Sequence, residues 1–538
     1  MARLDRGGVG AFGALWVVLA CVRVPYLVAL WPGVLSFDSI EQLQQVVGAV
    51  ALKNHHPVAH TLVVSAWVHL AQVFGGGVGA GVGLYSVFQL LALTGVFAYA
   101  LVRLRAWGMR GWAWWVAVAF FAVYDVHGYY AVTMWKDVLF SAAVLLSTVA
   151  LVDVLGARAA RQARRTAVLS WVLLIVGALG TLLLRNNGLY VVVLTGVACV
   201  AFGRGRRGAF LGLLVGLLVV HVVWTGPVFR ALGVEAGSSR EALSVPLQQL
   251  ARVCRDKPQA LSDEAQTVLY ELLERTPEQI AADYDPLLAN PVKDTFDDAW
   301  FAQHKGEFLR VWLETGRAAP GVYVASFLQG NYGYWWPFTR YWVTSDRIYP
   351  NDLGVTERPR GWVAPTPAEL YRTKTVPQRQ PGGWAMLNPR NMPVVQLIYH
   401  PGTAFWVLLC AACVPVVRAW RVVRVRGTRG CGPVESAGRT PPRMSLQLLL
   451  AWMPCATLWL TCLAGPVFDE YRYVYALFLC APVLLSAGSQ MRVKDRSEEP
   501  DCKHDERTAP RPIDSGRFFN YRGAVESLRG SRMRRIRV

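Results

Sequence analysis

The sequence predicts an all-α integral membrane protein with about ten transmembrane helices, an outer interfacial helix after the first span, and a mostly helical extracytoplasmic domain. Of its 538 residues, 54% are hydrophobic and only 17% are charged, against about 25% charged in a typical soluble domain. Apolar runs close to the ~20 residues that a helix needs to cross a bilayer recur along the chain. The net charge of +19 must therefore lie outside these runs. This composition excludes a disordered chain, a coiled coil and a small disulfide scaffold.

The predicted spans are ten apolar runs: 10–31, 84–103, 112–131, 137–155, 167–184, 189–202, 208–229, 396–417, 446–464 and 472–489. The first run continues to Trp31 without a convincing small-residue cleavage site, so it predicts an anchor rather than a removed signal peptide. Lys and Arg gather in alternate loops and in the tail. Because basic loops favour the cytoplasmic side, we predict a multi-pass cell-membrane protein with both termini in the cytoplasm.

The stretch Val58–Phe74 is apolar enough to pass for a further span. Counting it as one would place a basic loop on the wrong face of the membrane. Its polar residues Thr61, Ser65, His69 and Gln72 fall on one stripe of a helix. We therefore predict an amphipathic helix on the outer interface, and the alternative is an ordinary span with a polar packing face.

The chain then divides into four parts. Residues 1–230 form a transmembrane module with a first outer loop at 32–83, and residues 231–395 form the extracytoplasmic domain. Residues 396–490 return to the membrane, and 491–538 form a basic cytoplasmic tail expected to be disordered. The extracytoplasmic domain has seventeen basic and nineteen acidic residues, with helical patterns at 240–254, 262–276 and 296–315. The positive excess is thus explained by orientation and by membrane lipids, and no nucleic-acid partner is predicted.

Ionisable and amide side chains collect at the predicted outer ends of the spans, where such residues indicate function. The candidates are Asp38, Glu41, His55 and His56 in the first loop, Lys136 and Asp137 at the start of a span, Arg185, Asn186 and Asn187 in a tight turn, and Arg472 after Asp469 and Glu470. Walker, HExxH and GxSxG motifs do not occur in the sequence. An ATP-driven pump and a membrane zinc protease are therefore disfavoured.

Each cluster has a chemical and a purely structural interpretation. The two carboxylates and two imidazoles of the first loop suit a divalent cation or acid–base pairs. Alternatively, Asp38 and Glu41, which are three residues apart, resemble a capping arrangement at the start of a short helix. Arg185 and Arg472 look unpaired and lie against the positive-inside bias, so they suit a lipid phosphate or pyrophosphate. The alternatives are a plain hairpin turn and interface anchors.

The order of these pieces resembles the GT-C superfamily of membrane glycosyltransferases, and in particular a poorly characterised bacterial branch of multi-spanning proteins. The matching segments are PGVLSFDSIEQ, NHHPVAHT, WKDVLFS, LRNNG, SVPLQQLARV, DYDPLLANPVKDTF and RYVYA. The resemblance implies a transferase supplied by a polyprenyl-phosphate sugar on the outer face. It also implies that Asp38 is the base or a metal ligand, and that Asp137, with Lys136 beside it, is the second acidic motif.

The function predicted from these residues is transfer of a sugar from a lipid-linked donor to a cell-envelope acceptor. Asp38 and Asp137 would be catalytic. Glu41, His55, His56, Lys136, Arg185, Asn186, Asn187 and Arg472 would bind substrate. We infer the phosphate-binding role of Arg185 and Arg472 from their charge and position. A divalent cation is compatible with the first loop, but no metal is assigned. The alternatives are a transporter or flippase for a lipid-linked saccharide and a non-catalytic cell-envelope scaffold.

Overall fold

The computed structural model describes residues 2–156, 164–203, 205–338, 395–428, 446–465 and 470–490. Across these residues the protein is helical and contains no β-strand, only isolated bridges such as those of Val34 with Thr133 and Lys53 with Glu235. The all-α prediction is therefore confirmed for the described chain. The predicted tail 491–538, residues 339–394 of the predicted extracytoplasmic domain and Asp469 lie outside the described residues.

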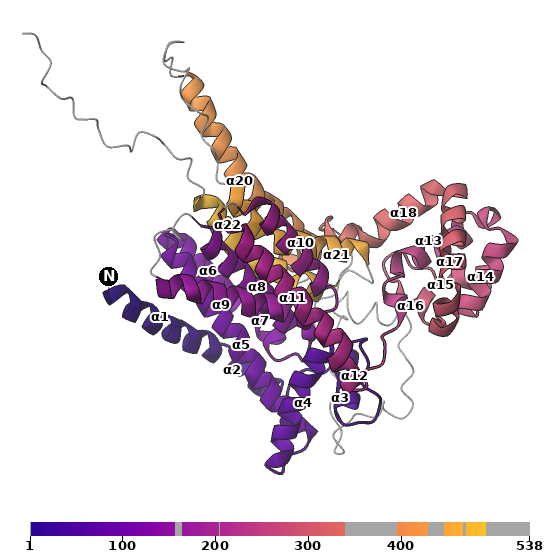
Figure 1. Ribbon diagram of the computed structural model, residues 1–538, viewed down its shortest axis with the longest axis horizontal. Helices are drawn as coiled ribbons and strands as arrows, with labels where there is room; N and C mark the ends of the chain where they lie inside the picture. The colour runs from indigo at the N-terminus through magenta and orange to yellow at the C-terminus, as the bar shows by residue number, and fades with distance from the viewer. Residues whose placement is uncertain are drawn as a thin grey trace, which may run out of the picture. The chain divides into compact units, whose positions relative to one another are not determined.

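All ten predicted apolar runs coincide with helices. These are α1 (Ala2–Cys21) with α2 (Val24–Ala29), α5 (Val78–Ala106), α6 (Gly111–Val123) with α7 (Asp125–Ala131), α8 (Lys136–Leu155), α9 (Arg164–Leu183), α10 (Gly188–Phe202), α11 (Arg207–Val223), α20 (Pro401–Thr428), α21 (Met453–Ala464) and α22 (Tyr471–Gln490). A π-turn, Trp224–Val228, joins α11 to α12 (Phe229–Ala231), and the 3₁₀ segments Val395–Tyr399 and Leu446–Trp452 precede α20 and α21. α8 is the most buried helix and packs against α5, α9 and α22 (Figure 1).

In the part of the chain that the structure describes, five helical stretches are long and apolar enough to cross a membrane: Val9–Ala29, Val78–Ala106, Lys136–Leu155, Thr166–Leu183 and Arg207–Ala231. The apolar parts of the remaining helices are shorter, including Gly188–Phe202, Leu448–Ala464 and Tyr471–Ala487. Several long apolar helices of this kind are typical of a membrane protein.

Two of the predicted continuous spans are broken. The run 10–31 is interrupted between α1 and α2, where Pro25 lacks an N–H group for the helical ladder. The run 112–131 is interrupted at Tyr124, whose backbone is extended. The buried side chain of Arg23 donates to the carbonyl oxygens of Leu19 (2.7 Å) and Phe121. One guanidinium thus contacts the C-terminal turns of two helices, whose partial negative charge stabilises a cation.

Two shorter helices follow the first apolar run: α3 (Phe37–Val46) and α4 (Val58–Val73). α4 has 16 residues, fewer than the ~20 that a span needs. The polar stripe predicted for this helix is divided in the structure. Thr61 is buried and accepts a hydrogen bond from Gln42 (2.9 Å), whereas His69 is exposed and contacts Ser65.

The predicted domain from residue 231 has its own hydrophobic core, built from residues such as Leu250, Leu269 and Val311. Its helices are α13 (Ser244–Asp256), α14 (Asp263–Leu273), α15 (Pro277–Asp283), α16 (Asn290–Lys293), α17 (Asp298–Ala318) and α18 (Pro320–Asn331), with short 3₁₀ turns at Ser239–Glu241, Pro258–Ala260 and Tyr332–Tyr334. The three helical patterns predicted for this region correspond to α13, α14 and α17 and are confirmed.

Candidate functional site

The start of α3 is fixed by serines. Ser36 is the N-cap residue, and its N–H donates to Ser39 Oγ (3.1 Å). Ser39 Oγ in turn donates to the Met134 carbonyl (2.8 Å), and Trp135 Nε1 donates to Ser36 Oγ (2.6 Å). The helix-cap interpretation of Asp38 and Glu41 is therefore wrong, because the two serines cap α3. The same contacts hold the start of α3 against the start of α8.

This arrangement brings Asp38 and the predicted cations together. Asp38 Oδ2 accepts hydrogen bonds from Lys136 Nζ (2.9 Å) and from Arg472 Nη1 (2.8 Å). Arg185 Nη1 lies 3.2 Å from Asp137 Oδ1, and Arg472 Nη1 lies 3.8 Å from Asp137 Oδ2. Arg472 Nε also donates to Glu470 (2.6 Å). We call the six residues Asp38, Lys136, Asp137, Arg185, Glu470 and Arg472 the ionic cluster.

The ionic cluster corrects the expectation that Arg185 and Arg472 are unpaired. Both guanidinium groups face carboxylates in the described structure. The charges of the three cations and three carboxylates cancel. Burial explains this balance, because an isolated charge in a low-dielectric site costs several kcal/mol and requires a counter-ion.

Aromatic rings hold the two arginines in place. The Arg472 guanidinium lies 4.8 Å from the centre of the Trp135 ring and 5.1 Å from that of Tyr473. The Arg185 guanidinium lies 4.7 Å from the centre of the same Tyr473 ring and 5.6 Å from that of Phe140. Such contacts favour a planar guanidinium over an ammonium group.

Asp137 differs from Asp38 in its hydrogen bonding. Its side chain is fully buried, and neither carboxylate oxygen has a hydrogen-bond partner among the described residues. Arg185 Nη1 is likewise without a hydrogen bond in the described structure, although it lies close to Asp137. Several other buried polar atoms of the described residues also lack a hydrogen bond, but Asp137 is the only carboxylate among them.

A hydrogen-bonded chain leads from Asp38 to the surface. Lys136 Nζ lies 3.1 Å from His56 Nδ1, and His56 Nε2 lies 3.2 Å from Glu41 Oε2. Burial and the Lys136 charge lower the pKa of His56, so the imidazole is neutral at neutral pH. An ammonium group can only donate, so Nδ1 of His56 accepts from Lys136 and Nε2–H donates to Glu41. That hydrogen bond is the main cause of the lowered pKa of Glu41.

Asp38 is held in its ionised form. Burial of this carboxyl opposes ionisation, but the positive charges of Arg472 and Lys136 outweigh it and hold the pKa of Asp38 well below its ordinary value. In this state Asp38 is a weak base, because both cations stabilise its negative charge.

The two asparagines of the predicted turn are mainly structural tethers. Asn186 Nδ2 donates to the carbonyl oxygen of Asn54 (3.1 Å), which lies in the loop that precedes α4. Asn187 Nδ2 donates to Thr461 Oγ1 (2.9 Å) on α21. These bonds hold the turn around Arg185 in position. Both asparagines also line the cavity that borders the ionic cluster, so their contact with substrate stays a prediction.

The ionic cluster borders a cavity of about 680 Å³. Its lining includes Asp38, His55, His56, Lys136, Arg185 and Arg472, and on another side Arg240, Glu241 and Lys293 of the helical domain. Sequence reasoning missed this second set of charged residues. Lys293 is 1% exposed and donates to Glu241 (2.6 Å). Lys293 lies in the segment DYDPLLANPVKDTF, but its partner lies 52 residues away and could not be found from this segment.

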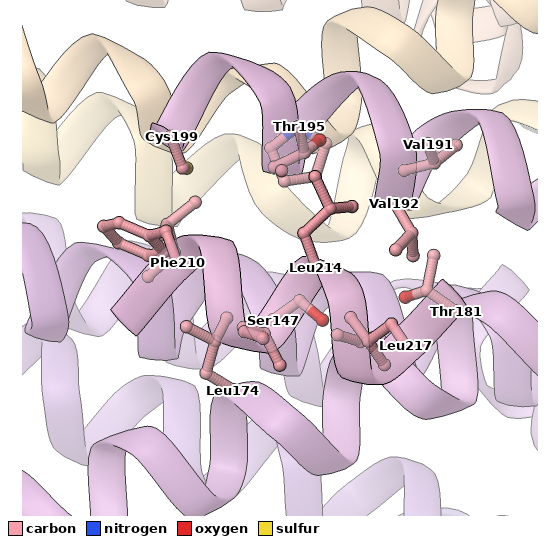
Figure 2. Close-up of a pocket in the computed structure, with 15 residues that line it drawn as sticks. Ser147, Leu174, Thr181, Val191, Val192, Thr195, Cys199, Phe210, Leu214 and Leu217 are labelled. Atoms are coloured by element: carbon pink, nitrogen blue, oxygen red, sulfur yellow. The ribbon is translucent and has the colours of Figure 1, made fainter. Parts of the chain in front are cut away.

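A second cavity, of about 60 Å³, lies between α8, α9, α10 and α11 (Figure 2). Its lining is almost entirely apolar, with Leu174, Val192, Phe210 and Leu214 among the side chains. The only titratable side chain among its lining residues is the thiol of Cys199. This cavity therefore offers space for apolar atoms but no acid–base or anion chemistry.

A metal site is disfavoured by the hydrogen bonding of His56. Glu41, His55 and His56 offer ligand atoms within 4.8 Å of one another, and such a set suits zinc or another first-row metal. A ligating imidazole normally donates its second N–H to an acceptor. In this structure Nδ1 of His56 faces the Lys136 ammonium, a donor, so ligation through Nε2 would place two donors against each other.

Comparisons with known proteins identify the family. A model of a family of unknown function, DUF6020, matches residues 47–424. The matched range includes His55, His56, Lys136, Asp137 and Arg185, whereas Asp38, Glu41 and Arg472 lie outside it. No curated protein and no solved structure matches the chain. Because the match covers more than half of its length, the chain belongs to the DUF6020 family.

Proposed function

We propose that this protein is a membrane glycosyltransferase of the GT-C type. It would move a sugar from a polyprenyl-phosphate-type donor to a cell-envelope acceptor on the outer face of the membrane. In this proposal the chain crosses the membrane about ten times, α4 lies on the outer interface, and both termini are cytoplasmic. The helical domain and the ionic cluster then share the outer side.

The proposal rests chiefly on one observation: the cavity at the ionic cluster is charged at one end and apolar at another. Its lining includes Tyr190 and Leu194 on α10 and Leu460 on α21. These side chains are 60%, 46% and 50% exposed, respectively. They lie on two helices that pack against each other. An anionic head group at the arginines with an apolar chain along α10 and α21 would satisfy both ends.

The donor phosphate would compete for the guanidinium groups of the ionic cluster. Arg185 and Arg472 suit a phosphate because their planar forks can make two parallel hydrogen bonds. As Arg472 turns toward the phosphate, Asp38 loses one of its two cations and becomes a stronger base. Lys136 remains in place to orient it.

The reaction follows from these positions. Asp38 takes the proton of the acceptor hydroxyl, and the acceptor oxygen forms a bond to the anomeric carbon. The bond between that carbon and the phosphate oxygen breaks, and the phosphate leaves with the electron pair. Arg185 and Arg472 stabilise the charge that develops on the leaving phosphate. The protonated Asp38 then loses its proton to water in the cavity.

Incubation of purified protein in proteoliposomes with a radiolabelled lipid-linked sugar tests the proposal. Transfer of label to an acceptor supports the transferase. Movement of label between leaflets without transfer supports the flippase. If neither transfer nor movement is observed, only a binding or scaffold role remains. The same assay with EDTA tests whether a divalent cation takes part.

A further inference from the structure

The two aspartates of the ionic cluster have different partners once a phosphate occupies the arginines. Asp38 keeps a hydrogen bond from Lys136 (2.9 Å), which does not depend on Arg472. The close cationic atoms around Asp137 belong to Arg185 (3.2 Å) and Arg472 (3.8 Å), and the described structure gives its oxygens no hydrogen bond. A phosphate that takes both guanidinium groups therefore leaves Asp137 in a buried site with the charge of Lys136, whose ammonium group is hydrogen-bonded to Asp38.

We propose that the ionic cluster binds a lipid phosphate together with one proton, which Asp137 accepts. The inference deepens the proposed function and rests on it for the position of the phosphate. It follows from charge balance, because a neutral cluster of three cations and three carboxylates becomes negative when an anion enters. Protonation of one carboxylate restores neutrality, and the fully buried Asp137 is the one left without hydrogen-bonding partners.

The protonated carboxyl also gains a function. Arg185 lines the cavity, whereas Asp137 lies beside this arginine and does not line it. Two like carboxylates in one site then have separate roles: Asp38 stays ionised as the base, and the neutral Asp137 releases the guanidinium of Arg185 for the phosphate. Environments that separate the two protonation states in this way are typical of acid–base pairs in enzymes.

Several groups face Asp137 and enter the prediction. Lys136 precedes it on α8, and Arg185 and Arg472 approach from the start of α10 and α22. Asp38 on α3, His60 on α4 and Cys462 on α21 also act on it electrostatically. His60 is neutral near pH 7, since burial lowers its pKa to about 3. Asp137 is thus the buried member of this group whose two close cations, Arg185 and Arg472, turn to the phosphate when it binds.

Calorimetric titration of the full-length protein with a geranylgeranyl phosphodiester, geranylgeranyl methyl phosphate, tests this inference, because a diester carries one negative charge and does not titrate near neutral pH. Titrations at one pH in buffers of different ionisation enthalpy give the number of protons taken up. We expect about one proton per phosphate, and the dissociation constant should rise about tenfold per pH unit above neutrality. Zero uptake, or release of a proton, would overturn the inference.

The Asp137→Asn variant separates this role from a structural one. Asn resembles the protonated acid, so it should bind the lipid phosphate at least as tightly as the parent at pH 8, without proton uptake. Glu264→Gln, in a surface pair with Arg310, is the matched control and should keep the uptake. Weakened binding with unchanged uptake in Asp137→Asn would refute the assignment.

Inorganic phosphate serves as the second probe. A lipid phosphate that binds at least ~100-fold more tightly, equivalent to about 2.8 kcal/mol, supports the assignment to a lipid head group, and equal affinities would overturn it. These readouts are independent of sugar transfer. Proton uptake without transfer would support the inference and refute the enzyme, and transfer without uptake would do the reverse.

Discussion

Replacing Arg472 with Lys tests whether the ionic cluster depends on the shape of the guanidinium rather than on its charge. Arg472 donates from Nε to Glu470 (2.6 Å) and from Nη1 to Asp38 (2.8 Å), while its plane lies over Trp135. An ammonium group at the end of a flexible chain keeps the charge. It cannot keep both hydrogen bonds and the stacking at once.

The expected loss follows from these contacts. One charge-assisted hydrogen bond contributes about 1.5–3 kcal/mol, and a desolvated cation–π contact contributes about 0.5–2 kcal/mol. Arg472→Lys should therefore destabilise the folded protein by roughly 2–5 kcal/mol. If the same fork also holds a phosphate in two parallel bonds, the affinity for a lipid phosphate should fall about 10- to 100-fold.

Thermal unfolding of the purified protein in detergent and calorimetric binding of a polyprenyl phosphate measure the two effects. Arg310→Lys is the matched control, because Arg310 pairs with Glu264 on the surface, with 53% of its side chain exposed. It should change stability by less than about 1 kcal/mol. If Arg472→Lys matches the parent in both measurements, Arg472 acts only as a point charge, and the proposed phosphate fork is wrong.

Three further predictions concern chemistry, topology and structure. Asp38→Asn should lower transferase turnover at least ~10²-fold, the lower range for loss of a general base. Glu41→Gln should lower turnover much less. Full activity in Asp38→Asn would remove Asp38 from the mechanism. In a variant whose accessible native cysteines have been removed, Ala51→Cys should react with an impermeant thiol reagent in intact cells, and Ala106→Cys should not. The opposite result would invert the proposed topology. Asp153→Asn should destabilise the protein by about 2–4 kcal/mol, since three donors lose a charged acceptor. The affinity for a lipid phosphate should stay unchanged. A parallel loss of binding would show that the two ends of α8 are coupled.

The helices and the candidate residues were largely predictable from the sequence, because both depend on local composition. Apolar runs predicted every span-like helix, and polar residues at their ends predicted Asp38, Lys136 and Arg185. Pairing was not predictable in the same way. The Asp38–Arg472 contact joins residues 434 positions apart, and local sequence does not specify which carboxylate a distant arginine meets.

Local patterns also misplaced some features. Asp38 and Glu41 have the spacing of a cap, but the neighbouring Ser36 and Ser39 compete for the same position and cap α3 instead. The run 112–131 is apolar up to Tyr124, but Asp125 and His127 follow, and α7 starts at Asp125. These two polar residues signal the break, which the average composition of the whole run does not show. The helical-domain side of the cavity was missed because Lys293 and Glu241 become neighbours only after α13 and α16 have packed together.

α8 carries buried aspartates near both of its ends, and their contrast argues that the ionic cluster binds a ligand. Asp153 accepts hydrogen bonds from Arg103 (2.6 Å), Trp107 (2.7 Å) and Tyr99 (3.2 Å). Asp137 has no hydrogen bond among the described residues, although Arg185 lies 3.2 Å away and a cavity of about 680 Å³ borders the cluster. A buried carboxylate that only stabilises a fold is expected to resemble Asp153, because each unmade hydrogen bond costs about 1–3 kcal/mol. This difference favours a structural role for Asp153 and agrees with the proposed phosphate site at the other end of α8, where Arg185 lines the cavity.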